Sequence, residues 1–346
     1  MDEAGAARVD SAWPTNDRSL PEPRRLVLGF PRRWEVALSP FAFEMERRAE
    51  GWLRQRGIIS DAATAEKFAK LAVAEYANWP FSRAEEDEAE VITKFLALWI
   101  FYDDLIEESD LGEGGGLFDA IAGSLDDRPH DSVYLACWSE LGRACAAKMS
   151  ASWRQRHATR FVDWARSVRE ESAHAELFRR TGASPTTFEH LARRSANIGM
   201  LPNIDFIEYQ SGRELSAATH EHPAMQDLVA LASEAVAIMN DVFGYAKDEQ
   251  ARWPNLIRCL RDERGLPLAG ALREAVSMHD ARVAAMDRAA EHLIADSREP
   301  IAVSGWVQDL RHVVYGFARW HATAPRYASV FDVGEGRRIA IGVGAR

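Results

Sequence analysis

The sequence predicts an all-α fold, a single bundle of ten or more helices around an apolar cavity. Helix start and stop signals recur along the chain, whereas the alternating pattern typical of strands is almost absent. The 346 residues, 47% of them hydrophobic, suffice for one large core, and no linker divides them convincingly. We therefore expect an irregular N-terminal arm at 1–33, one helical domain at 34–330 and a C-terminal tail at 331–346.

Capping residues, glycines and prolines bound the expected helices. Ser82 and Glu85, for example, form a capping box in front of the helix that carries a first acidic cluster. A glycine followed by a proline interrupts a later helix at 197–202. The expected helical segments are 39–57, 60–80, 82–108, 132–150, 151–180, 184–197, 223–253, 267–296 and 303–322, with loops at 110–117 and 126–131.

Charge and cysteine content narrow the classes of function. A net charge of −11 argues against nucleic acid and anionic membrane surfaces as partners. The three cysteines, Cys137, Cys145 and Cys259, lack metal-ligand spacing and indicate free thiols in a reducing compartment. No segment approaches the roughly 18 apolar residues of a membrane helix, and the acidic N-terminus does not resemble a signal peptide. We therefore expect a cytoplasmic protein.

A cluster of carboxylates follows a nearly continuous apolar run. The run at 96–102 (LALWIFY) leads directly into Asp103 and Asp104, and then into Glu107 and Glu108. Spacings of three and four residues bring these side chains to one face of a helix. Buried carboxylates of one sign are costly without a positive partner, and Mg²⁺ binds such oxygens together with water and phosphate. The alternative is an ordinary solvated helix end, but the apolar approach argues against it.

A second polar cluster follows another apolar helix. Asn240, Gly244 and Asp248 are spaced i, i+4, i+8 and therefore lie along one stripe of the helix. The stripe offers an amide oxygen, a gap and a carboxylate to a single ion. Glu249 lies on roughly the opposite side from Asn240, so we expect Asp248 to be the ligand. Two such clusters on two apolar helices favour a metal site over two polar helix ends.

Cationic residues accompany the two acidic clusters. Arg193 and Arg194 stand just before the helix break, and Lys247 lies inside the second cluster. Arg326 and Tyr327 follow the last long helix. Arginine binds phosphate oxygens with two parallel hydrogen bonds, and lysine adds a point charge. The pattern therefore indicates a phosphate-bearing ligand next to the metal.

Together these motifs resemble the bacterial class I terpene synthases, also called terpene cyclases. The aspartate-rich motif DDxxD/E of that family matches residues 103–107, and its second metal motif, (N/D)Dxx(S/T)xxxE, matches 240–248. Arg194, 46 residues before Asn240, stands where the family's diphosphate-sensing arginine is expected. Trp320 followed by Pro325-Arg326-Tyr327 is similar to the family's C-terminal signature.

The resemblance spans roughly residues 27–327 and includes the entry segment LGFPRRWEVALSPFAFEMERRAEGW. It implies a single class I terpenoid synthase α-domain with an apolar active-site cavity, and a Mg-dependent lyase that cyclises a linear isoprenyl diphosphate. Two positions of the second motif depart from the family. Gly244 replaces Ser/Thr, so a water must fill that ligand position, and Asp248 replaces Glu.

The resemblance also implies the roles of the site residues. Three Mg²⁺ ions are expected, with Mn²⁺ as a substitute. Asp103, with Asp104 or Glu107, would hold two ions, and Asn240 with Asp248 the third, with a water at Gly244. The residues expected to bind the diphosphate are Arg194, Lys247, Arg326 and Tyr327. The carbonyl that triggers ionisation lies within 197–199, next to Gly199, and is not assigned to one residue.

An aromatic wall is expected to stabilise the carbocation through ring faces. The candidates are Phe95, Trp99, Tyr102, Phe206, Tyr315 and Trp320, although ordinary core packing is the alternative for each. Closure of the loop at 110–117, which contains GEGGG, would exclude water, and an ordinary surface loop is the alternative. Farnesyl diphosphate is the expected substrate, with geranylgeranyl diphosphate second.

Two other functions are compatible with the sequence. An isoprenyl diphosphate synthase usually carries two DDxxD motifs, and only one occurs here, because Asp126-Asp127 belongs to a DDRP turn. A non-catalytic helical scaffold or binding protein is the alternative from a different class, and the altered second motif keeps it open. The sequence leaves the product and a homodimeric state undetermined.

Overall fold

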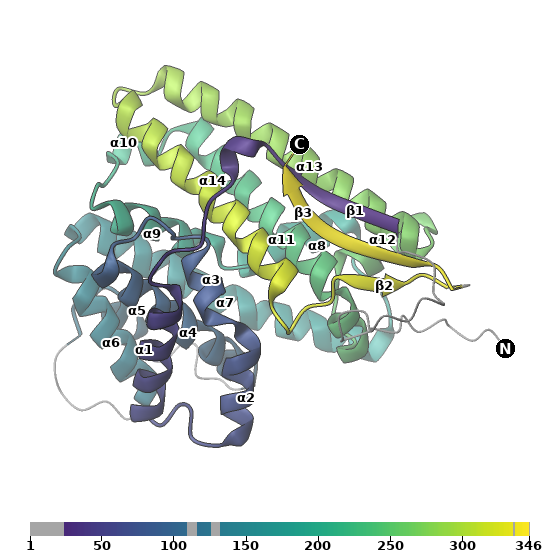
Figure 1. The fold of residues 1–346 in the computed structure, drawn as a ribbon, viewed down its shortest axis with the longest axis horizontal. Coiled ribbons are helices and arrows are strands. Elements are labelled where there is room, and N and C mark those ends of the chain that lie inside the picture. The colour runs from purple at the N-terminus through teal and green to yellow at the C-terminus, as the bar shows by residue number, and fades with distance from the viewer. Residues whose placement is uncertain (1–23, 109–115, 126–131, 335, 346) are drawn as a thin grey trace.

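The computed structural model describes residues 24–108, 116–125, 132–334 and 336–345, apart from the side chains of Asp104 and residues 106–108. It confirms the all-α prediction, with long helices packed around one apolar core (Figure 1). The helices are α1 (Ala42–Gln55), α2 (Ala62–Leu71), α3 (Val73–Asn78), α4 (Glu86–Glu108), α5 (Leu117–Ile121), α6 (Val133–Ala146), α7 (Ala151–Thr181), α8 (Thr187–Asn197), α9 (Met200–Ser211), α10 (Ala217–His220), α11 (Pro223–Ala251), α12 (Leu256–Arg264), α13 (Leu268–Asp296) and α14 (Pro300–Thr323).

Two expected helix boundaries are wrong. The segment expected to run from 60 to 80 is divided into α2 and α3 at Ala72, whose φ of 49° lies in the left-handed region. The capping box expected at Ser82 and Glu85 does not form, because the Ser82 hydroxyl is buried without a hydrogen-bond partner and α4 begins at Glu86. The loops expected at 110–117 and 126–131 lie outside the described residues, except for 116 and 117.

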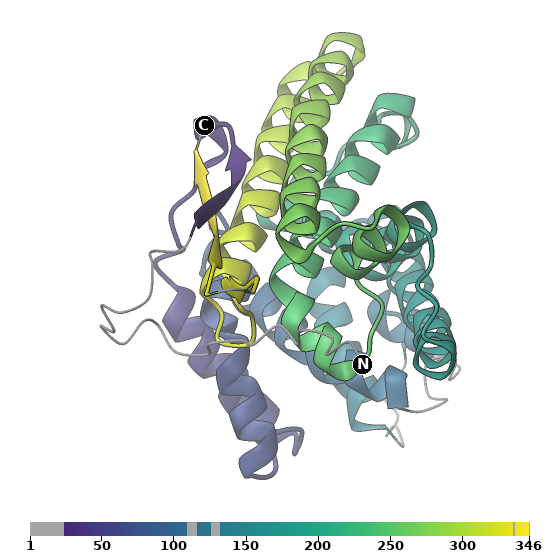
Figure 2. The ribbon, with the colours of Figure 1, turned by 90° about the vertical axis from the view of Figure 1, so that its right-hand side faces the viewer.

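The described end of the N-terminal arm, which we expected to be irregular, forms a strand that pairs with the C-terminal tail in a three-stranded sheet. The strands are β1 (Arg24–Phe30), β2 (Val330–Asp332) and β3 (Arg338–Ala345), and a short 3₁₀ helix, Arg32–Trp34, follows β1. β3 lies in the middle, parallel to β1 and antiparallel to β2. Figures 1 and 2 show this sheet lying along α13 and α14, where Leu28 and Phe30 are fully buried.

Helix α11 is the central element of the bundle, since it packs against α8, α9, α12, α13 and α14. Contrary to our expectation, its length and composition would allow it to cross a membrane, with a mean hydropathy of 1.3 over 18 residues. However, 78% of that stretch is buried inside the protein, as in the core helix of a globular domain. This burial fixes the orientation of the polar residues at its C-terminal end.

A buried charge cluster joins α7 to α9. Asp205 on α9 accepts hydrogen bonds from Arg156 Nε at 3.0 Å and from Arg160 Nη1 at 2.6 Å, and lies 3.4 Å from His157 Nδ1. Burial alone would raise the pKa of Asp205, but Arg160, His157 and Arg156 outweigh it and hold the pKa well below its usual range. The ionised carboxylate therefore stabilises the packing of the two helices that form one wall of the cavity described below.

Asp205→Asn is expected to lower the free energy of unfolding at pH 7 by about 3 kcal/mol, because the half-buried Arg160 loses its carboxylate partner and Arg156 keeps only Glu208. The folded-state pKa is depressed, so the stabilisation is complete above the unfolded-state value of about 3.9 and is lost as pH falls below it. Chemical denaturation between pH 7 and pH 2 measures both effects. A variant that loses stability with acid as steeply as the wild type would contradict the assignment.

Candidate active site

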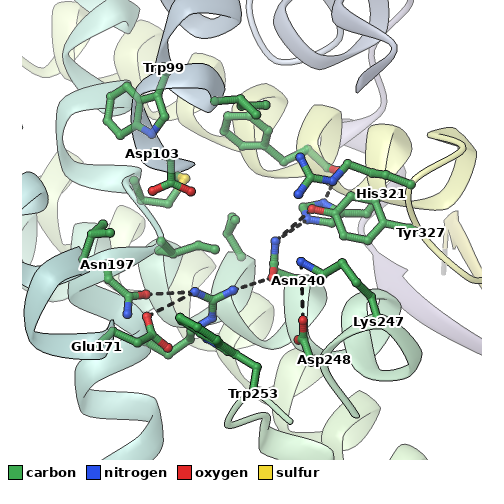
Figure 3. A pocket seen from close by; sticks show the side chains of 18 of the residues that line it. Trp99, Asp103, Glu171, Asn197, Asn240, Lys247, Asp248, Trp253, His321 and Tyr327 are labelled. Carbon is green, nitrogen blue, oxygen red and sulfur yellow. Dashed lines mark hydrogen bonds and ion pairs between the residues drawn. The ribbon is translucent and has the colours of Figure 1, made fainter. Parts of the chain in front are cut away.

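A cavity of about 420 Å³ opens between α4, α7, α8, α9, α11 and α14 (Figure 3). This volume falls within the range of small-molecule sites. Nine of the predicted site residues line it, namely Trp99, Asp103, Arg194, Asn240, Lys247, Asp248, Trp320, Arg326 and Tyr327. Both predicted motifs and the cationic residues therefore meet at one site.

The first acidic motif reaches the cavity through Asp103. Asp103 is half-buried on α4 and, in Figure 3, lies across the cavity from Lys247 and Asp248 on α11. The side chains of Asp104 and Glu107 lie outside the part of the chain that is described, so their roles stay predictions. The cavity thus has a carboxylate from each of two helices on opposite walls.

The second motif has the predicted arrangement along α11. A Cβ atom placed on Gly244 would lie 3.2 Å from Asp248 Oδ2 and 3.8 Å from Asn240 Oδ1, so the two oxygens flank the glycine. Glu249 does not line the cavity and instead pairs with Arg258 at 2.9 Å. The helical period therefore brings Asp248, and not Glu249, to the cavity, while its role as a metal ligand stays a prediction.

Asp248 is buried among polar partners. Its Oδ2 accepts a hydrogen bond from Asn255 Nδ2 at 2.9 Å, and its Oδ1 lies 3.4 Å from Lys247 Nζ. Burial raises the pKa of Asp248, although Lys247 opposes the shift. Burial disfavours the charged form of this carboxylate, so a cation placed beside it would stabilise that form strongly.

The orientation of the Asn240 amide is fixed by its neighbours. Its Oδ1 accepts from Arg194 Nη2 at 2.5 Å, while its Nδ2 donates to Tyr327 Oη at 3.1 Å and to His321 Nε2 at 3.2 Å. His321 Nδ1 donates to the Phe317 carbonyl at 2.7 Å, and burial lowers the pKa of His321 to about 3. The neutral ring therefore accepts at Nε2, which keeps the Asn240 oxygen directed towards Arg194.

Arg194 lies at the centre of a buried polar network. Its Nε donates to Asp241 Oδ1 at 3.0 Å and its Nη1 to Asn197 Oδ1 at 2.9 Å, and Glu171 Oε2 lies 3.6 Å from Nη1. Burial by itself would lower the pKa of Arg194, but Glu171, Asp241 and Asp248 raise it. The guanidinium is therefore permanently charged, and it reaches the cavity from α8. Arg193, its neighbour, lines a different hollow behind α8.

Asp241, which follows Asn240 in the motif, orients the guanidinium of Arg194. It is fully buried, contacts His190 Nε2 at 2.5 Å and accepts from the Leu256 backbone N–H at 2.7 Å. Burial opposes its ionisation, but His190 and Arg194 lower its pKa. Its position next to Asn240 was the only signal in the sequence for this role, and our sequence analysis did not use it.

Gly199 forms the break between α8 and α9. Its φ is +77°, and an added Cβ would lie 2.7 Å from Trp99 Cζ2, so only glycine fits. The Asn197 carbonyl accepts from Trp164 Nε1 at 3.0 Å, and the Gly199 carbonyl accepts from Asn203 Nδ2 at 2.9 Å. The break thus brings Asn197 and Ile198 to the cavity wall.

The predicted aromatic wall is partly wrong. Trp99 and Trp320 line the cavity, but Phe95 and Tyr102 pack against Trp138, with ring centroids at 4.8 Å and 5.7 Å. At about 100° per residue, Phe95 and Tyr102 lie about 40° and 60° from Trp99, away from the side of Asp103. They therefore stabilise the interface of α4 with α6.

The other two aromatic candidates also pack in the core rather than around the cavity. Phe206 contacts Phe95 at 4.8 Å, and Tyr315 contacts Phe30 at 5.4 Å. Several residues that line the cavity were not predicted from the sequence, namely Tyr76, Trp164, Glu171, Arg179, Trp253, Phe317 and His321. Of these, Arg179 at the end of α7 lies 5.4 Å from the Trp253 ring, so another cation borders the site.

The oxygen donors suit a hard divalent cation, although the protein alone does not complete a site. Among the described residues, no three or more His, Cys, Asp or Glu side chains cluster in a way that could hold a metal. Asp103, Asn240 and Asp248 instead offer oxygens from two walls, and the oxygens of Asn240 and Asp248 flank the position where Gly244 has no side chain. Mg²⁺ binds in this manner, through few carboxylates, with water and phosphate completing the shell.

The sequence matches a family described as terpene synthase family 2, C-terminal metal binding, over residues 94–285. It is 24% identical to the (+)-T-muurolol synthase ((2E,6E)-farnesyl diphosphate cyclizing) of Roseiflexus castenholzii, over 84% of this chain and 91% of that protein. It is 23% identical to the 7-epi-alpha-eudesmol synthase ((2E,6E)-farnesyl diphosphate cyclizing) of Streptomyces viridochromogenes, over 90% and 93% of the two chains.

Solved structures share the fold. The linalool/nerolidol synthase from Streptomyces clavuligerus superposes with a TM-score of 0.75 and 20% identity, over 83% of this chain and 98% of that one. The 2-methylisoborneol synthase from Streptomyces coelicolor A3(2), in complex with Mg²⁺ and 2-fluoroneryl diphosphate, gives a TM-score of 0.74 and 23% identity, over 88% and 98%.

Proposed function

The chain belongs to terpene synthase family 2, a metal-binding family of terpene-forming lyases, and we propose that it cyclises farnesyl diphosphate with release of diphosphate. The proposal rests on the arrangement of acidic and aromatic side chains around the cavity. Asp103 on α4 lies across it from Asn240 and Asp248 on α11, while aromatic rings line its apolar part. The two relatives described above are both named as farnesyl diphosphate cyclizing, which supports cyclisation over chain elongation or a scaffold.

We assign the divalent metal to both walls of the cavity. Asp103, with Asp104 or Glu107, would hold two Mg²⁺ ions, and Asn240 with Asp248 would hold a third, with a water above Gly244. Mn²⁺ is expected to substitute. When bound, the metal ions neutralise the charge of the leaving diphosphate.

Cationic and hydroxyl groups of the chain would bind the diphosphate itself. Arg194, Lys247, Arg326 and Tyr327 border the cavity and can donate to phosphate oxygens. The C–O bond of the substrate breaks heterolytically and its electron pair leaves with the diphosphate. Arg194 is anchored before substrate arrives, so it stabilises this charge without reorganisation.

For the carbonyl that faces the developing cation, we favour Ile198. The carbonyls of Asn197 and Gly199 already accept hydrogen bonds from Trp164 and Asn203, whereas Ile198 borders the cavity. This choice narrows the segment 197–199 proposed from the sequence.

The allyl cation needs a dry, aromatic environment. Rings of Tyr76, Trp99, Trp164, Phe317 and Trp320 border the cavity, and their faces can stabilise positive charge. All five rings are buried, so they also exclude water that would quench the cation.

We also propose that the protein works in the cytoplasm. All three cysteines are buried free thiols, and burial raises the pKa of each to about 12. Unpaired thiols are typical of reducing compartments.

Gly244→Ser is expected to lower the Mg²⁺ concentration for half-maximal activity by roughly fivefold, since it supplies the missing ligand oxygen. The new Cβ would lie 3.2 Å from Asp248 Oδ2, so that carboxylate must shift slightly. Gly244→Ala is the matched control, because it adds the same carbon without the oxygen. The rate of each variant is measured as a function of Mg²⁺ concentration. If Gly244→Ser and Gly244→Ala required the same Mg²⁺ concentration for half-maximal activity, the position of Gly244 would not be a ligand position.

The substrate is tested by incubating the purified protein with geranyl, farnesyl and geranylgeranyl diphosphates in Mg²⁺. Volatile products and released diphosphate are both measured. We expect a cyclic fifteen-carbon product from farnesyl diphosphate. If geranylgeranyl diphosphate were the one substrate that gave products, the proposed fifteen-carbon substrate would be wrong. A requirement for an added five-carbon diphosphate would indicate chain elongation instead of cyclisation.

A further inference from the structure

A second groove, of about 380 Å³, adjoins the cavity beside α2. It is lined by Ala63, Glu66, Lys67, Lys70 and Leu71 of α2, with Lys247 and Arg326. We infer that this groove is a second binding site for a diphosphate anion, used as the diphosphate group enters or leaves the catalytic cavity. The inference rests on the proposed function, because it gives the groove the same ligand chemistry.

The groove is strongly cationic in an acidic protein. Four of its side chains, Lys67, Lys70, Lys247 and Arg326, are positive, and one, Glu66, is negative. Glu66 lies 2.7 Å from Lys70, and Asp248 lies 3.4 Å from Lys247, but the lining itself has four cations to one anion in a chain whose net charge is −11. A concave patch with an excess of one sign concentrates its field and raises the local concentration of opposite ions. A di- or trivalent anion is therefore the ligand that fits it.

The side chain of Lys67 is held in place by two contacts with α4. Its Nζ donates to the Ile100 carbonyl at 3.3 Å and lies 4.7 Å from the centroid of the Phe101 ring. These contacts hold Lys67 of α2 against α4 within one turn of Asp103. The cationic groove thus lies beside the helix end that carries the first acidic motif.

The groove and the cavity share two residues. Lys247 and Arg326 line both, so a diphosphate group can contact the same cations from either side. The Lys247 side chain is 55% exposed, which leaves its ammonium accessible to an anion arriving from the groove. An anion can therefore pass between the two sites without losing its positive contacts.

Binding of inorganic diphosphate tests the groove directly. Calorimetric titration in EDTA removes the metal-dependent part of binding in the cavity, and substitution of Lys67 and Lys70, which line the groove but not the cavity, then isolates the contribution of the groove. Lys67→Gln/Lys70→Gln is expected to weaken this binding about tenfold, since it removes two cations. The pair Arg166→Gln/Arg264→Gln is the matched control. Both of these arginines are exposed, pair with carboxylates, and change the net charge equally. Equal affinities of the two double variants, or no EDTA-resistant binding by the wild type, would overturn the inference.

Kinetics with Mg²⁺ distinguish the two sources of the anion. A higher inhibition constant for inorganic diphosphate in the lysine variant indicates that the groove holds the product, and a higher KM indicates that it captures the substrate. No change in either constant would contradict the inference. If the double variant does not fold, Lys70→Gln alone serves, because that side chain is 58% exposed. Wild-type protein that binds diphosphate in EDTA but turns over no substrate would overturn the proposed function and leave the groove standing.

Discussion

Asp103→Asn is expected to lower the turnover of farnesyl diphosphate by about 10²- to 10³-fold, as expected when a preorganised electrostatic group is lost. Asp103 is the described carboxylate that the first motif places on the cavity wall opposite Asp248. The amide keeps the shape of the side chain but removes the charge that would attract a divalent cation. The rate of diphosphate release, measured at saturating Mg²⁺, gives the effect.

A matched control separates the site from the general charge of the protein. Asp163 lies on α7, is 57% exposed and pairs only locally with Arg166. Asp163→Asn should therefore keep the wild-type rate and the wild-type unfolding temperature. Turnover by Asp103→Asn within threefold of the wild type would remove Asp103 from the metal site.

Arg194→Lys is expected to lower kcat about 100-fold and the free energy of unfolding by about 2 kcal/mol. Lysine keeps the charge but cannot reproduce the planar fork that contacts Asp241, Asn197 and Asn240. The buried Asp241 then loses the hydrogen bond that Arg194 Nε donates to it, which accounts for the loss of stability. Steady-state kinetics and chemical denaturation measure the two effects separately.

Arg193→Lys is the control for this change. Arg193 is adjacent in sequence, but it lines the hollow behind α8 and not the catalytic cavity. We expect the kinetics of this variant to match those of the wild type. If both substitutions lowered kcat equally, the loss would come from disruption of α8 and not from contact with diphosphate.

Helical periodicity explains why much of the site could be predicted. The spacing of Asn240, Gly244 and Asp248 alone places the three on one face of α11 and directs Glu249 elsewhere. We did not apply the same period to α4, although it puts Phe95 and Tyr102 on the side of Trp99 that faces away from Asp103. Trp99 therefore lines the cavity and Phe95 does not, a difference set by α6 and α7.

Residues without a motif could not be predicted from the sequence. Glu171 and Arg179 are single charged residues on the long, mostly polar α7, and only tertiary packing brings them to the cavity. The sheet was missed for a related reason. β1 pairs with β3 across almost the whole length of the chain, so neither strand reveals its partner locally, and we did not use the alternation of Ile339, Ile341 and Val343 in β3.

The most direct test of the account is the release of diphosphate from farnesyl diphosphate with and without a chelator. We expect release together with a cyclic hydrocarbon or alcohol in Mg²⁺, no release in EDTA, and full recovery when excess Mg²⁺ is restored. Release that continues in EDTA, or its absence from folded protein in Mg²⁺, would contradict metal-dependent ionisation between α4 and α11.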